Sequence, residues 1–189
     1  MPLVPPTVPD ALIVRRVLDG DTEAFALLVA RYSDRCARCA TRIVGNREDA
    51  EEAVQDAFVR AYEALGEYRE RDRFYAWLFR ILINQCRSVV ARSARRELTF
   101  PDVEPDAPET FQPSELRTVD DSLADRDRLE RALGQLAPEQ REAVVLHLGE
   151  ELTYQEMAAA TGAGVSAMKM RVARGVARLR ALLTEVYCV

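Results

Sequence analysis

Eight of the nine prolines lie in two short segments of this 189-residue chain, four within residues 1–9 and four between Pro101 and Pro113. Because proline removes an amide donor and breaks a helix interior, regular structure has to lie between and after these segments. Both segments also lack apolar periodicity, which is typical of unfolded chain. We therefore expect a disordered tail over residues 1–9, a flexible acidic linker over residues 98–124, and two small folded domains at residues 10–97 and 125–187.

The first folded block has apolar residues at helical spacing almost throughout. A short helix is expected over Ala11–Leu18, Gly45 ends a second helix, and Asn46 is placed to cap a third. No segment shows the strict alternation that a strand requires, so we predict an all-α helical bundle. The apolar stripes are Phe25, Leu28, Val29, Tyr32, Cys36, Cys39 and Ile43, then Ala50, Val54, Ala57, Phe58, Ala61 and Leu65, then Phe74, Trp77, Leu78, Ile81, Leu82 and Val89.

The second block has the pattern of a helix-turn-helix. After a helix with Leu129, Leu133 and Leu136 and another starting at Pro138, the run Thr153-Tyr-Gln-Glu156 is a capping box that begins a helix of about two turns. Gly162 suits the turn, because glycine takes a left-handed conformation without strain. In the following helix we expect an inward stripe of Val165, Met168, Val172, Val176 and Leu179.

That stripe leaves a basic outer face on the last helix. Arginines and a lysine there can meet DNA phosphates or guanine edges, and Met170 can touch a thymine methyl group. The alternative is a helix whose arginines are only solvated. The candidate DNA-binding residues are Ser166, Ala167, Lys169, Met170, Arg171 and Arg174.

Aromatic and basic residues are interleaved from Tyr68 to Arg87. Flat rings stack on unpaired bases while guanidinium groups hold the backbone, so this segment can capture single-stranded DNA. For Phe74 and Trp77, core packing is the better interpretation. Phe79 and Ile83 lie on the opposite side of the same helix, which predicts that this helix contacts something beyond its own core.

The charge distribution is compatible with nucleic-acid binding despite a net charge of −5. The net charges of residues 1–97, 98–127 and 128–189 are +1, −7 and +1, so the negative excess lies in the linker. No run approaches the roughly 18 apolar residues of a membrane helix, and the start of the chain lacks signal-peptide features. We expect a soluble cytoplasmic protein that does not insert into a membrane.

No catalytic or metal-binding constellation is evident. Cys36 and Cys39 form a lone C-x-x-C at helical spacing, and the one histidine, His147, lies in the other block. Zinc needs three or four ligands, so the cysteines are better interpreted as small core residues. The glycines form no phosphate-binding loop and no nucleophile–base pair is apparent. We expect no cofactor, no metal and no enzymatic activity.

Several motifs, in this order, resemble bacterial sigma factors of the extracytoplasmic-function type over about 150 residues. Residues 49–58, DAEEAVQDAF, are similar to the clamp-binding helix of region two, and residues 74–84, FYAWLFRILIN, to its promoter-melting segment. Residues 136–142, 152–158 and 165–171 resemble region four, which reads the minus-35 element. The chain departs from the family pattern at Ser88, where an acidic residue is usual, and at residues 166–171, SAMKMR, where GTVKSR is usual.

The resemblance implies a subunit that binds core RNA polymerase, recognises minus-35 and minus-10 promoter elements, melts DNA, and is often held inactive by an anti-sigma factor. It implies a polymerase-binding set of Asp49, Glu52, Gln55, Asp56 and Phe58. It implies a minus-10, single-strand set of Tyr68, Arg69, Arg71, Arg73, Tyr75, Phe79, Arg80, Asn84 and Arg87.

Two other classes of protein compete with this interpretation. A stand-alone helix-turn-helix repressor or activator would account for the second block but leaves the aromatic-basic segment and the acidic face of residues 49–58 without a role. An enzyme carrying a regulatory helix-turn-helix lacks a site. Co-purification with core polymerase distinguishes a sigma factor from a stand-alone regulator.

Overall fold

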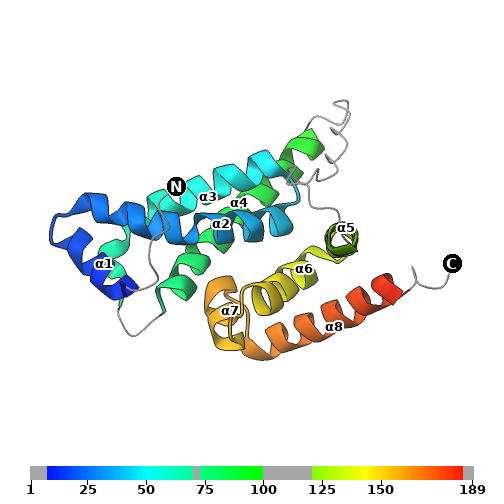
Figure 1. Cartoon of the computed structure of the whole chain (residues 1–189). Helices are drawn as coiled ribbons and strands as arrows, with labels where there is room; N and C mark the ends of the chain where they lie inside the picture. The colour runs from blue at the N-terminus through cyan, green and yellow to red at the C-terminus, as the bar shows by residue number, and fades with distance from the viewer. Residues whose placement is uncertain (1–7, 70–72, 100–120, 185–189) are drawn as a thin grey trace.

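The computed structural model describes residues 8–69, 73–99 and 121–184, and these are helical with no strand among them. The predicted tail and acidic linker therefore lie mostly outside the described residues, and residues 98–99 and 121–124 of the predicted linker are helical. Helices α1 to α4 form one unit and helices α5 to α8 a second, stacked beneath the first in Figure 1. We refer to residues 8–99 as the first unit and residues 121–184 as the second unit.

The first unit consists of four helices and two short 3-10 turns. The helices are α1 (Asp10–Leu18), α2 (Phe25–Val44), α3 (Arg47–Glu63) and α4 (Phe74–Thr99), and the turns are η1 (Thr22–Ala24) and η2 (Leu65–Glu67). Gly45 ends α2 in a left-handed conformation with φ of 84°, and the Asn46 side chain accepts a hydrogen bond from the Asp49 amide at 3.2 Å. Both predicted helix boundaries are confirmed.

The second unit contains α5 (Asp121–Gly134), α6 (Pro138–Val144), the π-helical turn η3 (Val145–Gly149), α7 (Tyr154–Thr161) and α8 (Val165–Thr184). Pro138 is the first residue of α6, as predicted, where its missing amide proton costs nothing. Helix α8 packs against both α6 and α7, and α7 also contacts the η3 turn.

The two units share one buried core, which two separately folded domains would not. Helix α4 packs against α3 and α2 in its own unit and against α7 of the second unit, and α6 and η3 pack on α2. Buried side chains run without a break from Leu28, Leu78 and Phe79 to Leu146 and Met157. The fold is all-α, as predicted, but the sequence pattern did not indicate that the units pack together.

Candidate functional site

The helix-turn-helix has the predicted local structure. The Thr153 hydroxyl accepts a hydrogen bond from the Glu156 amide at 3.2 Å, and the Glu156 carboxylate accepts one from the Thr153 amide at 2.8 Å, which completes the capping box. Gly162 ends α7 with φ of 72°, in the left-handed region. The capping box begins α7 and Gly162 ends it, both at the positions predicted from the sequence. Together they set where α8 starts.

The outer face of α8 is exposed as expected, with one difference in its inner stripe. Val165 is 37% exposed, so the prediction that it points inward is wrong. It is the first residue of α8, where no preceding turn covers it, and the buried stripe instead comprises Met168, Val172, Gly175 and Leu182. The sequence interpretation overlooked Gly175, which allows α6 and α8 to cross closely.

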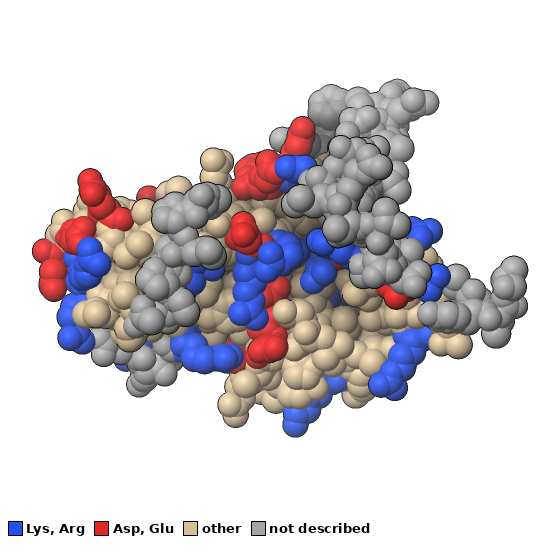
Figure 2. Space-filling view, viewed as in Figure 1, with Lys and Arg blue, Asp and Glu red and all other residues tan. Residues whose placement is uncertain are grey.

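The candidate residues on α8 differ in what surrounds them. Ser166, Ala167, Lys169, Met170 and Arg174 are exposed, and the apolar Met170 side chain is 54% exposed. Arg171 is half-buried and its guanidinium lies 3.0 Å from the Glu139 carboxylate of α6. Along the lower edge of Figure 2, over α7 and α8, basic surface is present with little acidic surface.

Lys169 lies beside a small aromatic pair. Its Nζ atom is 5.8 Å from the centroid of the Tyr154 ring, and that ring is stacked on His147 at 4.4 Å. The His147 Nδ1 atom is hydrogen-bonded to the Leu152 carbonyl at 3.0 Å. This arrangement keeps Lys169 at the side of α8, near the first turn of α7.

Helix α4 has two apolar faces that pack on different units. Phe74, Leu78 and Leu82 belong to the face toward its own bundle. Residues 75, 79, 83 and 87 recur every four positions and form a second stripe. Both ends of this stripe bond to the second unit, and the Phe79 and Ile83 side chains between them are fully buried. The predicted contact beyond the core of the first unit is therefore made by the second unit.

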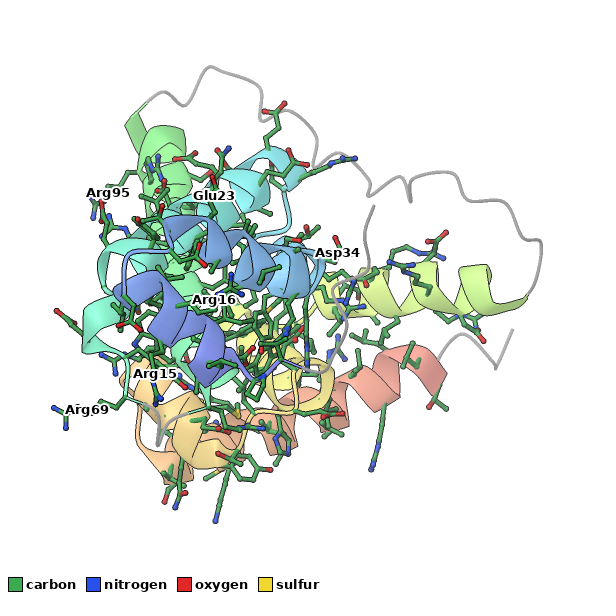
Figure 3. All side chains as sticks on the ribbon, turned by 60° about the vertical axis from the view of Figure 1, so that its left-hand side comes forward. Arg15, Arg16, Glu23, Asp34, Arg69 and Arg95 are labelled. Carbon is green, nitrogen blue, oxygen red and sulfur yellow. The ribbon has the colours of Figure 1, made fainter. Side chains whose placement is uncertain are left out.

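The predicted single-strand residues that the structure describes fall into three groups. Arg69, Arg80 and Asn84 are exposed, and Arg69 points away from the helices in Figure 3. Tyr68 is half-buried against Phe74 and Trp77, with ring centroids 5.5 Å apart in each case. Arg71 lies outside the described residues. Those facing the second unit are Arg73, Tyr75, Phe79 and Arg87.

Three carboxylates of the second unit meet this last group, and we call Glu142, Glu150 and Glu156 the interdomain glutamates. The Glu142 carboxylate accepts two hydrogen bonds from Arg87, at 2.8 and 2.9 Å, and that of Glu156 accepts two from Arg73, both at 2.7 Å. Glu142 and Glu150 are only 6% and 3% exposed. Figure 2 shows acidic and basic surface side by side along this seam.

Glu150 binds two groups of the first unit at once. Its Oε2 atom accepts hydrogen bonds from the Tyr75 hydroxyl and from Arg35 Nε, the latter at 2.8 Å, and the Glu150 carbonyl accepts another from Arg35 at 3.2 Å. The Arg35 guanidinium carbon lies 4.2 Å from the Tyr75 ring centroid, in cation–π geometry. Burial and the hydrogen bond to Glu150 raise the pKa of Tyr75 far above its usual range. Sequence reasoning missed Arg35 and Glu150, since they lie 115 positions apart and no local pattern links them.

Glu156 differs from the usual glutamate in its pKa. Burial opposes ionisation of Glu156, but hydrogen bonds from Arg73 and from the Thr153 amide and hydroxyl outweigh burial and lower the pKa of Glu156. Its charge therefore persists at neutral pH, where it neutralises one of the predicted DNA-binding arginines.

A groove lies between α2 and α3, along part of the predicted polymerase-binding face. Its floor is apolar and its rim on α3 is acidic; it is lined by Val29, Ser33 and Ala37 of α2 and by Glu48, Glu51, Glu52, Val54, Gln55, Phe58 and Val59 of α3. Val59 is 56% exposed. Three predicted residues, Glu52, Gln55 and Phe58, thus line one groove, whereas Asp49 and Asp56 lie outside its lining.

The acidic face of α3 also has a partner within the first unit. The Glu52 carboxylate lies 2.7 Å from Arg92 of α4, and both side chains are nearly half exposed. The hydrogen bond to Glu52, the nearby charge of Glu52 and, to a smaller extent, the charges of Asp49 and Asp56 raise the pKa of Arg92. The sequence did not indicate the pairing of Arg92 with Glu52, because 40 residues separate them and only the packing of α3 on α4 brings them together.

Cys36 and Cys39 lie in the core, as predicted, and so does Cys86, for which no prediction was made. Cys36, Cys39 and Cys86 are fully buried. Burial raises the pKa of Cys36 and of Cys86 to about 12 and that of Cys39 well above its usual value. The described residues contain no group of three or more His, Cys, Asp or Glu side chains placed to hold a metal ion. Nor does any described helix have the length and apolar character needed to cross a membrane.

Comparisons with known proteins identify the family of both units. Residues 28–96 match the family model for sigma-70 region 2, and residues 126–179 match the model for sigma-70 region 4. The RNA polymerase sigma-H factor of Pseudomonas aeruginosa is 32% identical, over 87% of this chain and 89% of that protein. The ECF RNA polymerase sigma-E factor of Escherichia coli K12 is 31% identical, over 87% and 89%.

Two solved structures have the same fold. The sigma factor RpoE of Bartonella quintana, in complex with the anti-sigma factor NepR, matches with a TM-score of 0.72 and 25% identity, over 85% of this chain and 96% of that one. CnrH, in complex with the cytosolic domain of CnrY, matches with a TM-score of 0.65 and 30% identity, over 93% and 97%. The chain therefore belongs to the extracytoplasmic-function family of RNA polymerase sigma factors, the subunits that act with core polymerase to initiate transcription at promoters.

Proposed function

We propose that this sigma factor acts through three surfaces: the α2–α3 groove with the acidic face of α3, the aromatic-basic segment around α4, and the outer face of α8. They bind core polymerase, the melted minus-10 strand and the minus-35 duplex, respectively. The chain acts in the cytoplasm and has no enzymatic activity of its own. The observation that carries the proposal is that all three surfaces lie on one all-α chain whose two units match regions two and four.

The docking of core polymerase on α3 is supported by the chemistry of the groove. An apolar floor beneath an acidic rim suits an amphipathic helical partner with basic residues at its edges. The exposed Val59 beside buried Phe58 extends the apolar floor to the surface. Arg92 neutralises Glu52 in the free chain, so docking has to displace or share that pair.

Charge reversal tests this docking surface. Replacing Asp49 and Asp56 by arginine should weaken binding to core polymerase, measured by fluorescence anisotropy, while far-UV circular dichroism stays unchanged. Arg38→Glu/Arg60→Glu is the matched control, because it reverses the same number of exposed charges on α2 and α3 in the opposite sense. If the Asp49→Arg/Asp56→Arg variant retains its affinity within about twofold, roughly 0.4 kcal/mol, polymerase docks elsewhere.

Promoter melting is assigned to the segment from Tyr68 to Arg87. Arg80 and Asn84 lie one helical turn apart on the exposed side of α4, where they can reach a displaced strand. Stacking and cation contacts contribute roughly 1–3 kcal/mol per base to single-strand binding. The single variants Arg80→Ala and Tyr75→Ala should therefore each impair open-complex formation more than closed-complex binding.

Permanganate footprinting at matched promoter occupancy measures that difference. Arg38→Ala, which removes an exposed arginine of α2 instead, should melt the promoter like the wild-type chain. Equal melting by all variants would argue against single-strand capture by α4.

An anti-sigma factor is the remaining partner that we propose for this chain. One similar solved structure contains a sigma factor bound to the anti-sigma factor NepR, and another contains CnrH bound to the cytosolic domain of CnrY. A regulator of this kind should form a stoichiometric complex with the full chain and abolish run-off transcription by the reconstituted holoenzyme. A complex that left transcription unchanged would not be an anti-sigma complex.

A further inference from the structure

The interdomain glutamates select particular side chains of the first unit. Their partners are Arg73, just before α4, Tyr75 and Arg87 of α4, and Arg35 of α2. Three of these four belong to the set assigned above to the promoter strand. Tyr75 and Arg87 are 12 residues apart on α4, so their contacts lie about 18 Å apart along the helix, and Arg73 extends the row by two residues. The carboxylates therefore follow the length of the proposed strand-binding surface.

The geometry of these contacts is that of an arginine–phosphate contact. Arg73 and Arg87 each present two nitrogen atoms to two oxygen atoms of one carboxylate, with all four distances between 2.7 and 2.9 Å. The planar guanidinium group binds carboxylate and phosphate oxygens in the same two-pronged manner. At the Glu150 contact, a hydroxyl and a guanidinium converge on a single oxygen atom, as they would on a phosphate oxygen.

Stability alone does not account for charged groups at this seam. The interface already buries apolar side chains, among them Phe79 and Ile83 of α4 and Met157 of α7. Glu142 and Glu150 are buried, and a buried ion pair usually contributes no more than an apolar pair of similar size, because both ions lose their hydration. The more exposed Arg73–Glu156 pair contributes little because water screens it. The cations of the first unit are thus better explained by a second ligand that requires them.

We propose that Glu142, Glu150 and Glu156 occupy positions on the first unit that bind phosphates of the promoter strand, and that Arg35 is a further phosphate contact beside Tyr75. This inference rests on the proposed function, because it concerns the same strand-binding surface. Closure of the two units and strand binding are then mutually exclusive. The strand binds only the open fraction of the chain, and its apparent affinity falls in proportion to that fraction.

Neutralising the glutamates tests the competition. In the full chain, Glu156→Gln removes one charge and keeps the capping box, since glutamine serves at this position as well as glutamate. The triple variant Glu142→Gln/Glu150→Gln/Glu156→Gln removes all three charges. Binding is measured by anisotropy with a fluorescein-labelled 20-nucleotide single strand of mixed sequence, after circular dichroism has shown that each variant is folded.

We expect a modest gain in affinity for Glu156→Gln and a gain of about fivefold or more for the triple variant, because the open fraction rises. The matched control is Glu139→Gln, which removes an acidic charge paired with Arg171 within the second unit and should not change the affinity. A folded Glu156→Gln variant that binds the strand no better than Glu139→Gln overturns the proposal, even if the triple variant fails to fold.

The role of Arg35 is tested in the Glu156→Gln background. Arg35→Ala should lower the affinity for the single strand and reduce the magnitude of the salt dependence by about 0.7, the contribution of one phosphate contact to single-strand binding. Arg42→Ala is the control, because Arg42 also lies on α2 and pairs across the seam, with Glu130 at 2.9 Å, but is not beside Tyr75. Equal salt slopes for the two variants would show that Arg35 binds no phosphate.

Run-off transcription with core polymerase separates this inference from the proposed function. If the wild-type chain supports transcription but the glutamine variants bind the strand no more tightly, the glutamates do not compete with DNA and the function stands. If the folded wild-type chain supports no transcription from any promoter of a genomic library, the proposed function itself is wrong.

Discussion

Substitution of Gly175 should disturb the crossing of α6 and α8 that positions the proposed minus-35 surface. A Cβ atom at this position would lie 2.6 Å from Val144 Cγ2 and 3.1 Å from the Gln140 carbonyl oxygen. Carbon atoms in good contact are about 3.5–4.0 Å apart, so the first distance is too short by about 1 Å. The Gln140 carbonyl belongs to the α6 backbone, so α6 has to move as a whole.

Two opposing effects determine the magnitude. Alanine gains about 1 kcal/mol over glycine in a helix interior, whereas overpacking a well-filled core costs about 1–3 kcal/mol. We expect Gly175→Ala to lower the free energy of unfolding by up to about 2 kcal/mol, and Gly175→Val to lower it further. Ala177→Gly, on the exposed side of the same helix, measures the helix-propensity effect alone and should cost about 1 kcal/mol.

A double-mutant cycle with Val144→Ala identifies the clash itself. Val144→Ala removes two buried methyl groups, at roughly 0.8 kcal/mol each, and makes room for the new Cβ atom. The double variant should therefore be more stable than the sum of the single effects by about 1 kcal/mol. Urea unfolding of the full chain, followed by circular dichroism, provides these values. If Gly175→Ala is instead more stable than the wild-type chain by the full propensity gain, the close crossing does not exist as described.

Three further predictions concern α8, the capping box and the buried thiols. Lys169→Ala should weaken binding to all promoters alike and lower the magnitude of the salt dependence of binding by about 0.9, whereas Arg174→Ala or Met170→Ala should lose about 1–3 kcal/mol of binding free energy at one base position. Selection on a randomised minus-35 library measures this base preference, and an unchanged consensus for both Arg174→Ala and Met170→Ala would place α8 in the groove at a different rotation. Thr153→Ala removes the side-chain acceptor of the capping box and should lower the unfolding free energy by about 0.5–2 kcal/mol, while Thr153→Ser should restore most of it. In a Cys188→Ser variant, the remaining thiols should resist iodoacetamide at pH 8, because burial raises the pKa of Cys36 and Cys86 to about 12 and that of Cys39 well above its usual value. Alkylation of the native chain at the rate of the urea-unfolded chain would show that these cysteines are not enclosed.

Local chemistry in the sequence was enough to determine the helices and most of their ends. Gly45, Asn46, the Thr153–Glu156 capping box and Gly162 act within one helical turn of themselves, so their effects can be inferred without any long-range contact. The two apolar faces of α4 were also visible in its periodicity, and they correctly required a second packing partner. The order of motifs along the chain indicated the family, which the comparisons confirmed.

Only the tertiary structure determined which distant groups meet. No local pattern links Glu142, Glu150 and Glu156 to Arg87, Arg35 and Arg73, because these contacts join positions 55, 115 and 83 residues apart. The close approach of α6 to Gly175 and the pairing of Arg92 with Glu52 were hidden for the same reason. Periodicity specifies which side of a helix is apolar. Which surface covers that side depends on how all the helices pack, and this packing placed the second unit on the second apolar face of α4.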